Sequence, residues 1–393
     1  MSVVNKSPWA ILLFVLLSSA SCQFTSQKKI AANDANTKID LAFYHPTIIK
    51  HAKGFEIKIL DNGLKELTVW DPWNKGKVFQ KYYLKNRGEE LKDTVPSDGL
   101  LVEVPIRSIA ALSSTQIGIL KFLNVQDKIV AVSLKDRIYD EDLNKKAQNG
   151  EIQAVGHSET LNFEKIVEID PELVMVAGFM KISERETKLM QAGLPVAYNI
   201  EWMESSPLAR AEWAKFIATF FNKEAEAEKH FKEVEDRYNG LKKLVYEVEN
   251  KPSILSGYNF KGTWYMPGGQ SYLGQFLRDG KADYYWFSDS TSGSIPLSFE
   301  VVFDKQGEAD IWFGPGQCKT LEDLKNLDDR YTLFKPYKTG NVFCYTKRMN
   351  SRGANDWFES GVMQPDVVFK DAIKILHPEL LPDYELYYYQ QLK

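Results

Sequence analysis

Residues 161–178 read LNFEKIVEIDPELVMVAG, and residues 297–314 read LSFEVVFDKQGEADIWFG. The two stretches align without a gap, and each has the pattern of a short helix followed by a buried strand. The identical positions are Leu161 and Leu297, Phe163 and Phe299, Glu164 and Glu300, Glu172 and Glu308, and Gly178 and Gly314. A unit that occurs twice, far apart, predicts two similar α/β lobes rather than a solenoid, which needs three or more copies.

The first 22 residues have the composition of an export signal. Lys6 precedes an apolar run at residues 9–17, which is shorter than the roughly 20 residues that span a bilayer. Small residues then lead into Cys22, as in a bacterial lipobox, although Ser19 stands where such boxes usually carry leucine. An ordinary cleaved signal with an incidental cysteine is the alternative. We expect residues 1–22 to be a lipoprotein signal peptide, Cys22 to be lipidated, and the exported protein to be anchored at the periplasmic face of the membrane.

Composition limits the class of protein. The chain has 393 residues, which is enough for two domains. Its net charge of −4 argues against a nucleic-acid partner. Outside the cytosol, Cys318 and Cys344 would form either a disulfide or two unpaired buried thiols, and we weigh these alternatives equally. The scattered histidines predict no metal site, and we expect no cofactor.

The residue pattern, and with it the predicted secondary structure, changes along the chain. Residues 23–40 are polar and predict a flexible tether. Residues 55–60 and 67–70 alternate around Asp61-Asn62-Gly63, which predicts a hairpin, and residues 77–84 add a further strand. From residue 101 onward, strands and helices alternate along the chain, which is typical of α/β lobes with largely parallel sheets. We therefore predict an α/β fold: two Rossmann-like lobes joined by a long backbone helix, with an N-terminal β-hairpin and strand extension.

Residues 208–250 are helical and rich in charge. Apolar positions at Phe231, Val234, Tyr238, Leu241 and Val245 recur every three or four residues and predict one buried stripe. A helix of about 26 residues would span roughly 39 Å. The predicted order is an N-terminal lobe with its β extension, a connecting helical region and a C-terminal lobe, at residues 41–207, 208–250 and 251–393.

Several stretches in this order resemble the ABC-transporter solute-binding proteins for ferric siderophores, haem and vitamin B12. The stretches are ALSSTQIGILKFLNVQDKIVAVS, NFEKIVEIDPELVMVAG, GLPVAYN, MPGGQSYLGQFL and GSIPLSFEVVFDKQGEADIWF. The resemblance extends over about residues 105–380, and the N-terminal strands and the tail are similar to a lipoprotein branch of that family. It implies a substrate-binding lipoprotein that delivers a ferric siderophore, a related iron complex or a corrinoid to an ABC permease dimer with its ATPase subunits. It also implies a monomer that is not an enzyme.

In the family that the chain resembles, one glutamate on each lobe docks on the permease. Glu164 and Glu300 occupy that position, each just after a residue suited to cap a helix, Asn162 or Ser298. On the residues alone, each glutamate is better explained by its favourable place in the first helical turn. The resemblance and the duplication favour docking.

The ligand site is expected between the lobes, where loops leave the carboxyl ends of the strands. Aromatic rings suit a macrocycle or a catecholate, and arginines suit an anionic iron complex. For any single aromatic residue, ordinary packing is an equal alternative. The candidate ligand-binding residues are Trp202, Trp264, Trp286, Arg137, Arg348 and Arg352.

We predict no catalytic residues. Residues 269–274, GQSYLG, miss the nucleophile elbow of hydrolases by one residue and lack a matching acid and base, so Ser271 is expected to cap a helix. A haem-specific or cobalamin-specific binding protein is the alternative within the family. A lipoprotein hydrolase and a sensor or scaffold on the same fold are the alternatives outside it.

Overall fold

The computed structural model describes residues 42–91, 94–157 and 160–393. The predicted signal peptide, Cys22 and nearly all of the tether lie outside these residues. Contacts group residues 40–393 into one unit, so the predicted lobe boundaries within it stay predictions. Among the described residues, no helix is long and apolar enough to cross a membrane.

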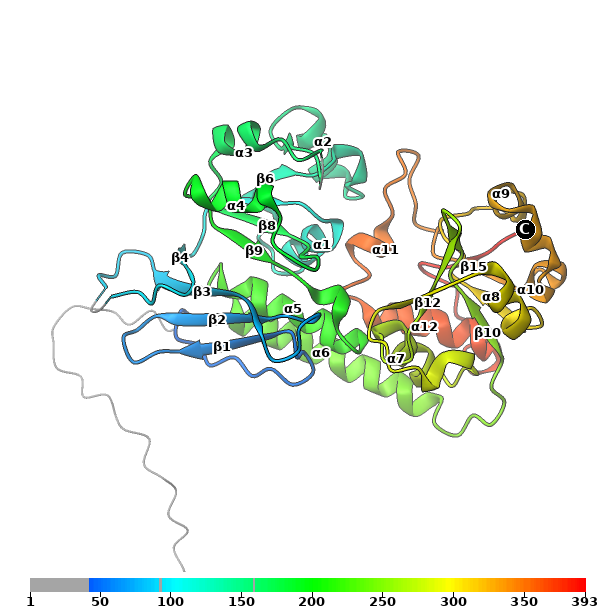
Figure 1. The fold of residues 1–393 in the computed structure, drawn as a ribbon. Helices are drawn as coiled ribbons and strands as arrows, with labels where there is room; N and C mark the ends of the chain where they lie inside the picture. The colour runs from blue at the N-terminus through cyan, green and yellow to red at the C-terminus, as the bar shows by residue number, and fades with distance from the viewer. Residues whose placement is uncertain (1–41, 92–93, 158–159) are drawn as a thin grey trace, which may run out of the picture. The chain divides into compact units, whose positions relative to one another are not determined.

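The N-terminal extension forms a four-stranded sheet in the order β1-β2-β3-β4 (Figure 1). β1 pairs with β2 and β2 with β3 in antiparallel register, which confirms the predicted hairpin, and β4 joins β3 in parallel. The bounds are β1 (Phe55–Ile59), β2 (Lys65–Trp70), β3 (Val78–Asn86) and β4 (Leu100–Val104). Gly63 has a φ of 85°, which the tight turn between β1 and β2 requires.

A five-stranded parallel sheet in the order β7-β6-β5-β8-β9 forms the first lobe. Its strands are β5 (Ile109–Ala111), β6 (Ile129–Val132), β7 (Gln153–Ala154), β8 (Leu173–Val176) and β9 (Val196–Tyr198), with helices α1 (Ser114–Phe122), α2 (Glu141–Gln148), α3 (Phe163–Ile169) and α4 (Glu184–Gln191). β5 lies in the middle with β6 and β8 on either side, so the strand order reverses there. In sheets of this kind, ligands bind outside the carboxyl ends of the strands at the reversal.

The second lobe contains a sheet in the order β10-β14-β15-β16, in which the first three strands are parallel. These strands are β10 (Ile254–Ser256), β14 (Ile311–Phe313), β15 (Val342–Cys344) and β16 (Gln390–Gln391), and the helices of the lobe are α7 (Tyr272–Asp279), α8 (Phe299–Gln306), α9 (Leu321–Leu327), α10 (Lys335–Thr339), α11 (Asp356–Glu359) and α12 (Pro365–Leu376). A second, antiparallel sheet was not predicted; it consists of β11 (Asn259–Phe260), β12 (Thr263–Pro267) and β13 (Ser294–Leu297). The α/β class with two parallel sheets is as predicted.

The connecting region is two helices, not one. α5 (Pro207–Thr219) ends before Asn222, whose φ of 54° breaks the helix, and α6 (Glu224–Leu244) follows with 21 residues. α6 is therefore shorter than the predicted length of about 26 residues. Its buried side includes Phe231, Val234 and Tyr238, and it packs against both α5 and α12 (Figure 1).

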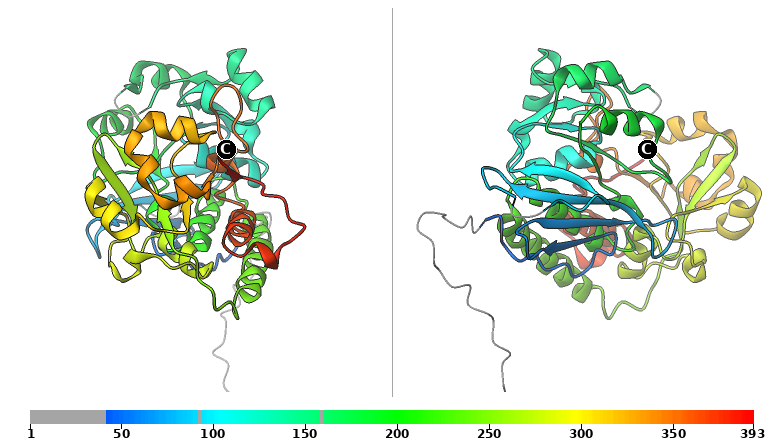
Figure 2. Two further views of the ribbon diagram at one scale, coloured as in Figure 1. Left: turned by 90° about the vertical axis from the view of Figure 1, so that its right-hand side faces the viewer. Right: turned by 60° about the vertical axis from the view of Figure 1, so that its left-hand side comes forward.

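The N-terminal sheet is fixed to α5 by packing and by buried carboxylates. Phe55 on β1 packs its ring 5.0 Å from that of Trp213, and Figure 2 shows the sheet lying over the green helix. Glu212, which is fully buried, accepts hydrogen bonds from the backbone N–H groups of residues 50, 51 and 52. Glu204 accepts further N–H groups from Lys53 and Gly54. The extension is consequently part of the folded body.

Candidate functional site

Two of the predicted ligand residues follow strands of the first lobe. Arg137 is exposed on the 3-10 helix η2 (Lys135–Arg137), just beyond β6. Trp202 is half-buried on η4 (Glu201–Met203), just beyond β9. Both therefore lie at the carboxyl edge of the sheet, where the sequence placed them.

The two predicted tryptophans of the second lobe are packing residues. Trp264 is not on a loop but on β12; it is fully buried, its ring lies 5.8 Å from that of Trp312, and its indole N–H donates to the carbonyl of Ser256. Trp286 is only 9% exposed on η5 (Tyr285–Ser288), against the rings of Tyr284 and Tyr285. Trp264 is thus a core residue, and neither tryptophan is carried into the proposal below.

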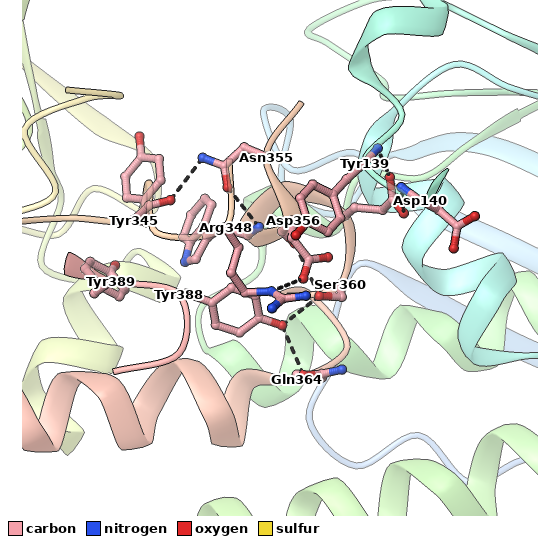
Figure 3. A network of polar contacts seen from close by, with 12 residues as sticks. Tyr139, Asp140, Tyr345, Arg348, Asn355, Asp356, Ser360, Gln364, Tyr388 and Tyr389 are labelled. Atoms are coloured by element: carbon pink, nitrogen blue, oxygen red, sulfur yellow. Dashed lines mark hydrogen bonds and ion pairs between the residues drawn. The ribbon is translucent and has the colours of Figure 1, made fainter. Parts of the chain in front are cut away.

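Arg348 and Arg352 belong to a segment that connects the lobes, residues 348–364, which we call the bridging segment. Arg348 pairs with Asp356 at 2.6 Å, and its guanidinium lies 5.5 Å from the ring centre of Tyr139 in the first lobe (Figure 3). Arg352 pairs with Glu141 of α2 at 3.1 Å. Both arginines already have acidic partners, and both reach the first lobe, Arg348 at the ring of Tyr139 and Arg352 at Glu141.

The firmest contact of the bridging segment is made by Glu359. Its fully buried carboxylate accepts the backbone N–H groups of Tyr139 and Asp140, at 2.7 and 3.2 Å, and the Lys121 ammonium lies 3.4 Å away. Burial raises the pKa of the Glu359 carboxyl, although the two N–H groups and Lys121 favour its charged form. Gly118 on α1 makes the approach feasible, because a Cβ there would lie 1.6 Å from the Glu359 carbonyl oxygen. α11 is thereby held directly against α1.

Next to the bridging segment, a small cavity of about 40 Å³ lies between α5 and the second lobe. Arg210 of α5, Tyr272 of α7, Trp357 of α11 and Tyr389 are among the residues that line it. The Arg210 guanidinium lies 4.7 Å from the ring centre of Tyr272 and 3.4 Å from the Glu201 carboxylate. The cavity therefore combines a charge-balanced arginine with aromatic walls.

Several buried polar atoms around this edge have no hydrogen-bond partner within the described part of the chain. Two belong to residues that line the cavity: the Nε of Arg210 and the Nε1 of Trp357. Others lie just beyond the strands, on Asn199 and Glu201 after β9 and on Gln116 at the start of α1. An unpaired buried polar group costs about 1–3 kcal/mol, so such a cluster calls for a functional explanation.

Sequence reasoning named the loop after β9 and missed Arg210 entirely. Arg210 lies in a helix whose residues are nearly all buried, and its position in the helical pattern gave no signal. Trp357 was visible as an aromatic residue next to Arg352, yet only the fold shows that it lines a cavity. Both are contributions of tertiary structure.

The duplicated helices α3 and α8 present their glutamates in equivalent places. Asn162 and Ser298 cap them as predicted, by accepting the backbone N–H groups three residues on, at 2.9 and 3.4 Å. Glu164 and Glu300 lie in the first turns and are exposed. Hydrogen bonds from the backbone and from Ser298 lower the pKa of Glu300. The Arg330 guanidinium lies 3.6 Å from the Glu300 carboxylate, and both residues line an open hollow of about 750 Å³.

Three further predictions concern chemistry. Cys318 and Cys344 are free, buried thiols, which is the second of the two alternatives, and burial raises the pKa of Cys318 to about 11. Ser271 caps α7, since its hydroxyl accepts the N–H of Gly274 and donates to the carbonyl of Gly268. Within residues 42–91, 94–157 and 160–393, no group of three or more His, Cys, Asp or Glu residues is placed to hold a metal ion.

Known proteins resemble this chain at the level of sequence. An uncharacterised lipoprotein of Methanocaldococcus jannaschii is 29% identical, and the match covers 94% of this chain and 92% of the relative. A second uncharacterised lipoprotein of the same organism is 27% identical over 76% of each chain. Both matches extend over most of the chain rather than over one motif.

Solved structures resemble the chain in fold. A periplasmic solute-binding protein of Veillonella parvula has a TM-score of 0.53 and 15% identity, covering 84% of this chain and 89% of its own. A possible iron-binding, periplasmic solute-binding protein of Staphylococcus epidermidis has a TM-score of 0.52 and 19% identity, covering 69% and 98%. At these identities the likeness concerns the fold alone.

A family model described as periplasmic binding protein matches residues 109–349, from the first strand of the first lobe to the start of the bridging segment. The match includes both repeat units, both glutamates and the connecting helices. Family membership places the chain among solute-binding proteins rather than enzymes. The chain belongs to the periplasmic binding protein family.

Proposed function

We propose that this chain is the substrate-binding lipoprotein of an ABC importer, and that it captures a ferric siderophore or a related iron complex or corrinoid. The observation that carries the proposal is the cavity between α5 and the second lobe, where the buried Arg210 Nε and Trp357 Nε1 have no protein acceptor among the described residues. A ligand with acceptor oxygens would offer these donors the partners that the described residues do not supply.

The size of the cavity limits what enters it. Binding sites for small molecules occupy roughly 300–1,000 Å³, and this cavity holds about 40 Å³. One substituent of the ligand therefore fits, such as a carbonyl or a carboxamide. The Arg210–Glu201 pair is electrically balanced, which favours a neutral acceptor there. The body of the ligand would lie outside, over the loops at the carboxyl edges of the sheets.

Docking on the permease is assigned to Glu164 and Glu300. The support is their exposure on equivalent turns of the two repeat units. Separated charges of this kind orient a partner and speed encounter more than they add affinity. The proposal further places the lipid on Cys22, in keeping with the lipoprotein names of the two relatives.

Calorimetric titration tests the proposed cargo. A form that starts at residue 23 keeps the whole compact unit, residues 40–393, and would be titrated with ferric hydroxamate and catecholate siderophores, haemin and cyanocobalamin. Saturable binding of one class, one ligand per chain, is expected and would identify the cargo. If every titration is flat, the assignment to iron complexes and corrinoids fails, while the family assignment stands.

A further inference from the structure

Three aromatic rings from distant parts of the chain meet beside the carboxyl edge of the first lobe. Trp73 comes from the turn between β2 and β3, Phe179 follows β8, and Trp202 lies on η4 after β9. Trp73 lies 6.1 Å from Phe179 and 5.9 Å from Trp202, and Phe179 stacks on Trp202 at 5.9 Å with an interplanar angle of 18°. We call Trp73, Phe179 and Trp202 the aromatic wall.

The turn that carries Trp73 is firmly built. The Asp71 carboxylate accepts the backbone N–H groups of Trp73 and Asn74, at 2.8 and 2.9 Å, and the backbone N–H of Asp71 donates to the carbonyl of Lys77. Phe79 on β3 supports the indole from behind, with ring centres 5.9 Å apart. The N-terminal sheet thus presents Trp73 in one orientation, which lowers the entropic cost of using it in recognition.

The wall is not sealed by the protein. Phe179 is 65% exposed and its neighbour Met180 is 58% exposed, whereas large apolar side chains are normally covered. Met180 also has a φ of 47°, a left-handed conformation that is costly for a residue with a side chain. Exposure and backbone strain at adjacent residues point to a recognition surface.

The wall is linked to the proposed ligand site through η4. η4 carries Trp202 in the wall, and its first residue, Glu201, pairs with Arg210, which lines the cavity. Figure 1 shows the blue turn between β2 and β3 reaching toward the green segment that follows β9, in agreement with the contact between Trp73 and Trp202. The same short helix therefore positions one ring of the wall and the carboxylate that pairs with Arg210.

We propose that the N-terminal sheet supplies a third wall to the ligand site, and that Trp73 selects ligands that carry a flat conjugated ring system. This inference rests on the proposed function. It extends it because Trp73 lies outside residues 109–349, the part that matches the family. Stacked rings bind flat surfaces through dispersion and quadrupole contacts that an aliphatic chelate does not offer.

The test compares ring-bearing and aliphatic ligands on single variants. Trp73→Ala and Phe179→Ala would be titrated beside the wild type with haemin, cyanocobalamin, a ferric tris-catecholate and an aliphatic ferric hydroxamate. The expected result is an affinity about tenfold lower for the ring-bearing ligand that the wild type binds, with Trp73→Phe recovering most of it. Tyr246→Ala is the matched control, since Tyr246 is 70% exposed at the end of α6 and should leave affinity unchanged.

Several outcomes would overturn the inference. An unchanged affinity in Trp73→Ala would do so. A wild type that binds only the aliphatic hydroxamate would do so as well. A lowered unfolding midpoint in Trp73→Ala together with weaker binding of every ligand would show that Trp73 only supports the fold. A wild type that binds nothing defeats the proposed function first, so the two failures are distinguishable.

Discussion

Buried carboxylates are the residues that integrate the N-terminal extension into this fold. Glu212 is fully buried, accepts three successive backbone N–H groups from residues 50–52, and also pairs with Lys215 at 2.8 Å. Each of these donors would be left without an acceptor if the carboxylate were removed. The extension would then lose its attachment to α5.

The first prediction concerns this carboxylate. Glu212→Ala is expected to lower the free energy of unfolding by about 3–5 kcal/mol, because it leaves buried backbone donors without an acceptor and the Lys215 ammonium without its carboxylate partner. Urea denaturation measures the change. Glu226→Ala is the control: Glu226 forms an exposed pair with Lys223 on α6, and its loss should cost less than about 1 kcal/mol. Equal effects of the two variants would contradict the structure.

A second residue gives a prediction about pH. Hydrogen bonds from Lys335 and from Ser253 lower the pKa of Asp310 from 3.8 to about 2. The folded state therefore holds the charged form more strongly than the unfolded state does, and this stability is present above pH 3.8 and lost as the pH falls toward 2. Asp310→Asn should flatten the fall in unfolding free energy over that window. Parallel wild-type and variant curves between pH 5 and 2, measured in urea, would refute the assignment.

Sequence alone predicted residues whose role is local. Asn162, Ser298 and Ser271 cap helices as their spacing indicated, because a cap depends on residues within one turn. Trp264 was misplaced because its strand, β12, pairs with distant β13, which no local pattern reveals. Arg210 was missed for the same reason: the ring of Tyr272 that it contacts and Trp357, which lines the same cavity, are remote in sequence.

At the scale of elements, the contact between α1 and α11 is the least expected feature. Nothing in the sequence of the bridging segment marks it as a link between lobes, since its partners lie more than two hundred residues away. The repeat units, by contrast, were predictable because each contains its own helix and strand. The break at Asn222 separates the nearly fully buried α5 from the charge-rich α6.

The third prediction tests the α1–α11 contact with two helical glycines. Gly118→Ala places a Cβ 1.6 Å from the Glu359 carbonyl oxygen, so the helices must separate, and the unfolding free energy should fall by about 1–3 kcal/mol. Gly240→Ala in α6 meets nothing within 4 Å and should raise the unfolding free energy by about 0.4–1 kcal/mol. Thermal or urea unfolding separates the two. A neutral or stabilising Gly118→Ala would show that α11 does not pack on α1.

At the scale of the whole molecule, the family and the fold agree while the cargo is a matter of local chemistry. The match to the family model includes both repeat units and the connecting helices. In the proposed function, the ligand is decided by side chains that the fold brings together, such as Arg210, Trp357 and the aromatic wall. This is why the fold could be predicted from the sequence and the ligand could not.

The fourth prediction concerns docking. Glu164→Arg combined with Glu300→Arg should abolish ligand uptake by cells that carry the permease, since each arginine would repel a cationic docking pocket. Ligand affinity and the unfolding free energy should be unchanged within about 0.5 kcal/mol, because both side chains are exposed. Glu168→Arg, exposed on the same helix as Glu164, is the control. Normal uptake by the double variant would remove these residues from the docking surface.

The most direct test of the account is the affinity of Arg210→Ala for the ligand that the titration panel identifies. If the solute is seated between α5 and the second lobe, calorimetry should show an affinity at least about tenfold weaker, a loss of about 1.4 kcal/mol. Arg107→Ala, exposed in the first lobe, should bind like the wild type. Equal affinity in Arg210→Ala and the wild type, with both proteins folded, would contradict the account and place the solute elsewhere.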